Sequence, residues 1–390
     1  MKDLKIFAKT VDQKALDQID LLLAQEPFKD CKVRIMPDVH AGKGCVIGFT
    51  ANLGNKVIPN IVGVDIGCGM LTVELGQIDI NYDALDWTID RFVPSGMAVH
   101  EHASSFLVPF IRSFYCHEQL HDVNWLLCSM GTLGGGNHFI EVDEDDKGNK
   151  YLIIHTGSRN LGKQVAEIYQ NLAIERIYSM KNERRALIDQ LKAEGREKEI
   201  AGELAKLKKK TSIPKELCYL EGEDRDNYLH DMQLCQAFAK QNRNYIADRI
   251  CHSMGWKPIN KFHTVHNYID DTGMVRKGAI SARADEPLLI PINMRDGCIL
   301  GHGRGNEDWN QSAPHGAGRL MSRKEAKASI PISEYEATMA GIWSTSVSAA
   351  TLDEAPQAYK PMDEILSCIS ETVNVDRIIK PVYSFKAGER

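Results

Sequence analysis

Two features common in other protein classes are missing from this sequence. None of the 10 cysteines forms a CxxC pair, so neither a disulfide framework nor a compact cysteine-based zinc motif is expected. No uninterrupted apolar run is long enough to cross a bilayer, and residues 1–13 lack the apolar core of a secretion signal. The sequence therefore predicts a cytoplasmic protein with no membrane partner.

Positive charge is also scarce for a protein that would bind nucleic acid. The chain has 47 Lys and Arg against 53 Asp and Glu, a net charge of −6. Any nucleic acid would have to be held by a local basic surface rather than by the field of the whole molecule. With 390 residues and 43% hydrophobic content, the chain can bury a large core, and its length fits one large α/β domain or two smaller ones.

Short runs rich in β-branched residues predict strands joined by tight, polar loops. Glycine, proline and aspartate separate these runs, and each run ends in or next to a loop with polar side chains, as active sites usually do on a rigid sheet. The predicted strands lie within residues 31–37, 44–53, 57–67, 70–75, 137–143, 151–157, 287–293 and 297–303.

The middle of the chain, residues 163–254, reads as helical. Near its end, Leu234 and Phe238, and then Ile246 and Ile250, repeat at a spacing of four, which predicts a helix with one face packed on the main body. Residues 182–210 are highly charged, which predicts a projecting helical hairpin. Two interpretations stay open for it: a solvated surface insertion, which alternating charge favours, or an arm that grips RNA.

The stretch 64–70, "VDIGCGM", places an aspartate and a cysteine three residues apart in a glycine-rich turn. A carboxylate beside a thiolate indicates a metal site that needs further ligands. Three histidines beside strand-like runs can supply them, because a sheet gathers such loops at one edge. The candidate ligands are Asp65, Cys68, His138, His155 and His266.

Five ligands are too many for one tetrahedral ion and suit two ions that share the thiolate. Two divalent ions about 4 Å apart clamp the oxygens of a phosphoryl group, so the set points to phosphate chemistry. A mixed oxygen, nitrogen and sulfur set suits manganese, zinc, iron or cobalt.

A separate histidine, His315, begins the stretch "HGAGR". The small residues Gly316, Ala317 and Gly318 let backbone N–H groups approach a phosphate, and Arg319 can pair with its oxygens. A neutral imidazole there can attack phosphorus and form a phosphoramidate. The alternative is that His315 is a sixth metal ligand. Glycine-rich stretches elsewhere add candidate phosphate-binding cations at Arg159, Arg276, Lys277, Arg283, Arg304, Arg319 and Arg323.

These motifs, taken in order, resemble one known family. The matching stretches are "MPDVHAGKG", "GVDIGCGM", "GTLGGGNHFIEV", "HTGSRNLG", "HNYI", "RKGAISARA", "HGAGRLMSR" and "AYKPMDE", which together cover nearly the whole chain. The chain resembles the RtcB family of GTP-dependent RNA ligases. The resemblance implies a single large α/β (α+β) catalytic domain over residues 1–390, with central β-sheets and a helical insertion at about 163–254.

The resemblance also implies a mechanism. Two Mn²⁺ ions would be held by the five ligands with Cys68 as the bridge, and His315 would attack the α-phosphorus of GTP. The GMP would pass from His315 to an RNA 3′-phosphate, formed where necessary from a 2′,3′-cyclic phosphate. A 5′-hydroxyl end would then displace GMP and seal the strand. Neither the particular RNA nor the need for an activating protein partner follows from the sequence.

Nucleotide contacts implied by the resemblance include a phosphate contact at Asn137, a ribose contact at Glu141, and guanine contacts at Tyr359 and Lys386. In the family's guanine-contacting segment, Asn293 and Cys298 stand where relatives carry serines. Elsewhere, Val265 replaces a histidine of many relatives, and the chain extends a few residues past the usual ending.

Two other functions use the same residues. A dinuclear phosphodiesterase or nuclease would use the metals with water as nucleophile and would need neither His315 nor Glu141. A non-enzymatic binder of RNA ends would have lost nucleotide specificity through the change at 292–298. The intact ligand set and His315 favour the ligase.

Overall fold

The computed structural model describes residues 3–42, 44–103, 107–179, 181–206 and 211–387. Its centre is an antiparallel sheet whose two edge strands approach each other, since Leu289 N–H donates to Thr264 Oγ1 across 3.3 Å. The sheet therefore curls into a nearly closed barrel. In spatial order its strands are β13 (Pro287–Asn293), β14 (Gly297–Gly303), β16 (Val373–Lys386), β6 (Phe139–Glu144), β7 (Lys150–Thr156), β5 (Gly69–Gly76) and β9 (Asn260–Val265).

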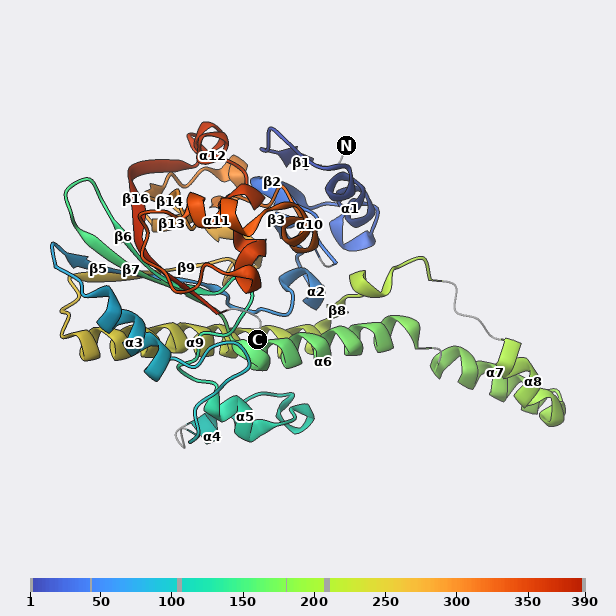
Figure 1. The fold of residues 1–390 in the computed structure, drawn as a ribbon. Helices are drawn as coiled ribbons and strands as arrows, with labels where there is room; N and C mark the ends of the chain where they lie inside the picture. The colour runs from blue at the N-terminus through green and yellow to red at the C-terminus, as the bar shows by residue number, and fades with distance from the viewer. Residues whose placement is uncertain (1–2, 43, 104–106, 180, 207–210, 388–390) are drawn as a thin grey trace.

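Both faces of this curled sheet carry buried apolar clusters. Its inner face carries a compact apolar cluster that includes Met70, Phe139, Ile153 and Leu289. Its outer face packs on α3 (Tyr82–Phe92) and α9 (Gly222–Met254), which run beneath β5, β7 and β9 (Figure 1). The sheet is thus a rigid support for the loops at its ends.

A second sheet lies beside the first and supplies further strands to the same region. Its order is β1 (Asp3–Ile6), β2 (Lys32–His40), β3 (Ile47–Asn52), β11 (Met274–Lys277) and β10 (Asn267–Ile269), with only the β1–β2 pair parallel among the described strands. Two small ladders complete the strands: β12 (Ala279–Ser281) with β15 (Ser312–Pro314), and β4 (Lys56–Val57) with β8 (Leu220–Glu221).

Two long helices, α6 (Arg159–Tyr178) and α9, run beneath the curled sheet and form most of the helical insertion (Figure 1). Helices α6 and α9 lie side by side, while α7 and α8 project away from the body at the far end of α6 (Figure 1). The predicted helical insertion is confirmed, and it begins at Arg159. The other helices are α1 (Gln13–Leu23), α2 (Pro59–Val62), α4 (Leu107–Arg112), α5 (Val123–Cys128), α7 (Lys181–Ala193), α8 (Ile200–Lys206), α10 (Arg323–Ser329), α11 (Ile332–Thr338) and α12 (Met362–Ile369).

One strand prediction is wrong. Most of the run 57–67 is not extended: after the short β4, helix α2 begins at Pro59. Proline suits the first position of a helix because its φ is already fixed and it lacks an N–H, and Gly63 ends the turn with a φ of 88°. Each of the remaining predicted strands overlaps an observed one. No helix in the described part of the chain combines the length and apolar character needed to cross a membrane.

Candidate active site

The register of the curled sheet brings the predicted metal ligands to one end of it. Gly69, at the start of β5, is paired with Thr156 at the end of β7 and with Val265 at the end of β9. Phe139, at the start of β6, is paired with His155. Residues that immediately precede or follow these positions must therefore meet. They include Cys68, His138, His155 and His266, and the fifth predicted ligand, Asp65, lies in the turn that leads to Cys68.

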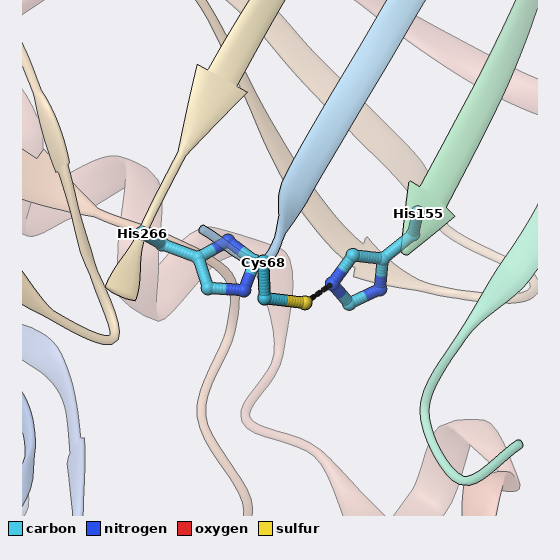
Figure 2. A group of neighbouring side chains, drawn as sticks. All are labelled: Cys68, His155 and His266. Carbon is cyan, nitrogen blue, oxygen red and sulfur yellow. Dashed lines mark hydrogen bonds between the residues drawn. The ribbon is translucent and has the colours of Figure 1, made fainter. Parts of the chain in front are cut away.

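The Cys68 thiol lies at the centre of this group. Its Sγ is 3.3 Å from Nε2 of His155 and 3.5 Å from Nε2 of His138, and His138 Nε2 is 3.1 Å from a carboxylate oxygen of Asp65. Figure 2 shows Cys68 between His155 and His266. The donor atoms form two sets, each within 4.8 Å: Cys68, His155 and His266 in one, and Asp65, Cys68 and His138 in the other. The thiol is shared, as two ions with one bridging ligand require.

The imidazole rings are held so that they present nitrogen lone pairs to the cluster. Nδ1 of His138 lies 2.9 Å from the Leu133 carbonyl, and Nδ1 of His155 lies 3.1 Å from the Asn137 carbonyl. A ring that donates from Nδ1 has its lone pair on Nε2, which in both residues faces Cys68. His266 has a buried Nδ1 without a hydrogen-bond partner in the described structure. A buried ring nitrogen without a hydrogen-bond partner costs free energy of folding unless a ligand binds to it.

The protonation preferences of the cluster suit a cation. Burial lowers the pKa of His155 and His266 well below the usual value, so both rings are neutral near pH 7. Burial acts to raise the pKa of Asp65, but the contact with His138 outweighs this and lowers it. Burial and the neighbouring Asp65 raise the pKa of the Cys68 thiol. A divalent ion would displace that proton, and the residues therefore fit a dinuclear metal centre.

The turn that carries Cys68 is fixed by close backbone contacts. Gly67 has a φ of +70°, and a Cβ there would lie 2.9 Å from Gln236 Cα on α9, so the turn can approach the helix only with glycine. The Gly67 N–H donates to the Asn267 carbonyl across 2.8 Å, and the His266 N–H donates to the Cys68 carbonyl across 3.0 Å. These bonds lock the loop of His266 to the loop of Cys68.

His315 approaches the cluster from a different strand pair. It follows β15, and its ring centroid is 4.8 Å from that of His266. One oxygen of Asp38, on β2, lies 2.6 Å from His315 Nδ1 and accepts the His315 backbone N–H across 3.1 Å. Asp38 is fully buried. Sequence reasoning did not single out Asp38, although an aspartate directly after the predicted strand 31–37 is the signal that could have found it.

The cluster opens into a cavity of about 320 Å³. The ribose and phosphate contacts implied by the resemblance line it, as does the small-residue loop that follows His315. Neither His138, which contacts Cys68, nor Cys298, which is buried on β14, is among the described residues that line the cavity. The predicted residues on the wall are Asp65, Cys68, Asn137, Glu141, His155, His266, Asn293, His315, Gly316, Ala317, Gly318, Arg319, Tyr359 and Lys386.

A buried carboxylate that sequence reasoning missed, Glu354, organises the wall opposite the cluster. It accepts the Tyr359 hydroxyl and the Lys386 ammonium, each across 2.7 Å, and forms ion pairs with Arg319 and Arg323. Burial acts to raise its pKa, but Lys386 and Arg323 lower it to about 2. The network holds Tyr359 and Lys386, the two predicted guanine contacts, in one place.

Of the candidate phosphate-binding cations, Arg319 and Arg323 line the cavity. The guanidinium groups of Arg276 and Arg283 instead form ion pairs with Asp270, at 2.7 and 3.0 Å. Lys277 is buried and donates to the Val62 carbonyl across 3.0 Å. Local positive charge at the cavity therefore comes from fewer residues than the sequence suggested.

The fold and the site fit a metal-dependent enzyme, with a candidate centre of mixed oxygen, nitrogen and sulfur donors. The chain belongs to the tRNA-splicing ligase RtcB family, whose model matches residues 21–112 and 117–387. It is 29% identical to the RNA-splicing ligase RtcB of Escherichia coli K12, over 93% of this chain and 92% of that one. It is 26% identical to the tRNA-splicing ligase RtcB of Nanoarchaeum equitans, over 88% of this chain and 85% of that one.

Proposed function

We propose that this protein joins RNA 3′-phosphate or 2′,3′-cyclic phosphate ends to 5′-hydroxyl ends, using GTP and a GMP–histidine intermediate. One observation carries the proposal: His315 is hydrogen-bonded through Nδ1 to the buried Asp38, and it stands beside a cluster suited to two metal ions. A hydrolase would use water as its nucleophile and would have no need for an oriented histidine at that place.

In the first step His315 acts as the nucleophile. With its Nδ1–H donated to Asp38, the ring carries its lone pair on Nε2. Nε2 attacks the α-phosphorus of GTP, a nitrogen–phosphorus bond forms, and the bond to the β-phosphate oxygen breaks to release pyrophosphate. The ring becomes positively charged, and the Asp38 carboxylate, 2.6 Å away, stabilises that charge.

The GMP group then moves to RNA. An oxygen of the RNA 3′-phosphate attacks the same phosphorus, the nitrogen–phosphorus bond breaks, and His315 is regenerated. The 5′-hydroxyl of the second RNA end attacks the activated 3′-phosphate and expels GMP. A 2′,3′-cyclic end must first be opened by water to the 3′-phosphate.

The remaining residues bind and position. Asp65, Cys68, His138, His155 and His266 would hold two divalent ions, Mn²⁺ by resemblance, which when bound neutralise phosphate charge. Gly316, Ala317 and Gly318 offer backbone close to the phosphates, and Asn137 and Arg319 add polar contacts. Glu141 would contact the ribose, and Tyr359, Lys386 and Asn293 the base.

The test is ligation of two labelled RNA oligonucleotides, one with a 3′-phosphate and one with a 5′-hydroxyl, in the presence of Mn²⁺ and GTP. Wild type should join them, and His315→Ala should not. His302→Ala is the matched control, because its ring pairs with Asp376 away from the described cavity lining. Joining by His315→Ala at the wild-type rate would contradict the proposal, and GTP-independent cleavage would favour the phosphodiesterase.

A further inference from the structure

A second group of donor atoms lies inside the curled sheet, apart from the Cys68 cluster. Glu141 and Asp143 project from the same face of β6, and Cys298 projects from β14. One donor atom from each lies within 4.8 Å of the others. The three residues are 3%, 0% and 1% exposed, respectively. They share no residue with the ligands already described, and Glu141 is three positions beyond His138, about 10 Å along a strand.

The surroundings of these carboxyl groups are apolar. Cys298 belongs to the inner apolar cluster, together with Phe139, Tyr151 and Ile379. Phe139 shares a strand face with both carboxyls, and Tyr151 is paired with Asp143 across the sheet. Two negative charges placed in such a setting repel each other and lose their hydration.

No cation pairs with Asp143 in the described residues. Both of its carboxylate oxygens are buried, and the groups within hydrogen-bonding reach of them are Glu141 and Cys298 themselves. Lys386, whose charge acts on Glu141, is already paired with Glu354 at 2.7 Å. Burial raises the pKa of Asp143 well above its usual range, with Glu141 adding to the effect, and burial raises the pKa of Glu141 as well. A fully buried carboxylate whose neighbours are a second carboxylate and a thiol, with no cation paired to it, indicates a missing ligand.

We propose that Glu141, Asp143 and Cys298 form a separate binding site for a single divalent cation. Two carboxylate oxygens and one thiolate sulfur suit Zn²⁺ or another borderline ion and leave a fourth position open. The ion has a route of entry, because Glu141 lines the cavity whereas Asp143 and Cys298 lie deeper. The two positive charges of the ion offset most of the negative charge of the two carboxylates and the thiolate, and binding displaces the protons that these groups hold in its absence.

The test uses Co²⁺ as the probe, because a thiolate bound to Co²⁺ gives a sulfur-to-metal charge-transfer absorption. The background is the full-length Cys68→Ala chain, in which the thiol of the other cluster is gone. We expect the band to persist in Cys68→Ala, to disappear in Cys68→Ala/Cys298→Ser, and to persist in Cys68→Ala/Cys251→Ser. Cys251 is the matched control, being a buried cysteine in a different apolar cluster.

A second variant covers the case in which Cys298→Ser fails to fold. Cys68→Ala/Asp143→Asn keeps the thiol and the side-chain shape, and it should weaken Co²⁺ binding about tenfold or more, as loss of a charged ligand does. Circular dichroism confirms folding of each variant. The proposed site would be overturned if the Cys68→Ala chain gave no band, or if Asp143→Asn left the Co²⁺ affinity of that chain unchanged. Glu141 and Asp143 would then be a pair of carboxyl groups that share a proton. Because the assay uses a background without Cys68, its result is independent of the proposed ligase activity.

Discussion

The contact between Asp38 and His315 gives the sharpest prediction about catalysis. A single buried oxygen of Asp38 accepts from both the Nδ1 and the backbone N–H of His315, at 2.6 and 3.1 Å. In Asp38→Asn, an amide oxygen in the same place can keep both hydrogen bonds while the negative charge is lost. The substitution therefore isolates the stabilisation of the charge that develops on the ring when Nε2 attacks phosphorus.

The magnitude follows from the difference between a charged and a neutral acceptor. Hydrogen bonds to charged groups contribute about 1.5–3 kcal/mol, and roughly half of that survives with a neutral acceptor. Loss of about 0.8–1.5 kcal/mol of transition-state stabilisation slows the step by roughly 4- to 13-fold. Asp38→Ala loses orientation as well and should be slower than Asp38→Asn.

The assay is single-turnover formation of labelled GMP–protein at saturating GTP and Mn²⁺. Metal content is measured in parallel, because Asp38 is outside both donor sets and neither substitution should change it. A folded, metal-loaded Asp38→Asn chain that reacts within about twofold of wild type, a difference of roughly 0.4 kcal/mol, would refute this role for the carboxylate.

Three further predictions concern the metal centre, the phosphate loop and stability at low pH. Cys68→Ala removes the donor shared by both sets and should reduce the metal bound per chain, measured by elemental analysis after dialysis; unchanged content would exclude a bridging thiolate. Gly318→Ala should disturb the loop and slow guanylylation, since Gly318 has a φ of +76° and a Cβ would lie 2.4 Å from the Asp38 carbonyl oxygen; wild-type rates would show that the loop adjusts freely. Burial lowers the pKa of His263 from its usual 6.5 to about 3, and the positive charge of Arg243 adds to this effect. Because only the unfolded chain takes up this proton between those values, His263 contributes stability above pH 6.5 that is lost on acidification, at up to about 1.4 kcal/mol per pH unit. Urea unfolding should therefore show a steeper acid loss for wild type than for His263→Asn, and parallel curves would contradict the shift.

Sequence patterns found the sheet strands because alternating burial and turn residues are local properties. The run 297–303 coincides with β14, and 70–75 lies within β5. The prediction of a strand over 57–67 failed because its apolar residues fit a short helix as well as a strand, and Pro59, near its start, favours the first turn of a helix.

The site was predictable where donor chemistry is unusual and hidden where it depends on long-range contacts. Cysteine and aspartate in one glycine-rich turn are informative by themselves, and histidines at strand ends are natural partners. Asp38 acts through His315, which is 277 positions away in the sequence. Glu354 acts through Lys386, on a different element. Cys298 lies on a strand that the sequence predicted, but its position beside Asp143 inside the curled sheet depends on contacts between distant strands.

The most direct test of the central claim is transfer of label from α-labelled GTP to the protein in the presence of Mn²⁺. Wild type should acquire acid-labile GMP, and His315→Ala should acquire none while binding the same amount of metal. Label on His315→Ala equal to that on wild type, or no label on a metal-loaded wild-type chain, would contradict His315 as the nucleophile.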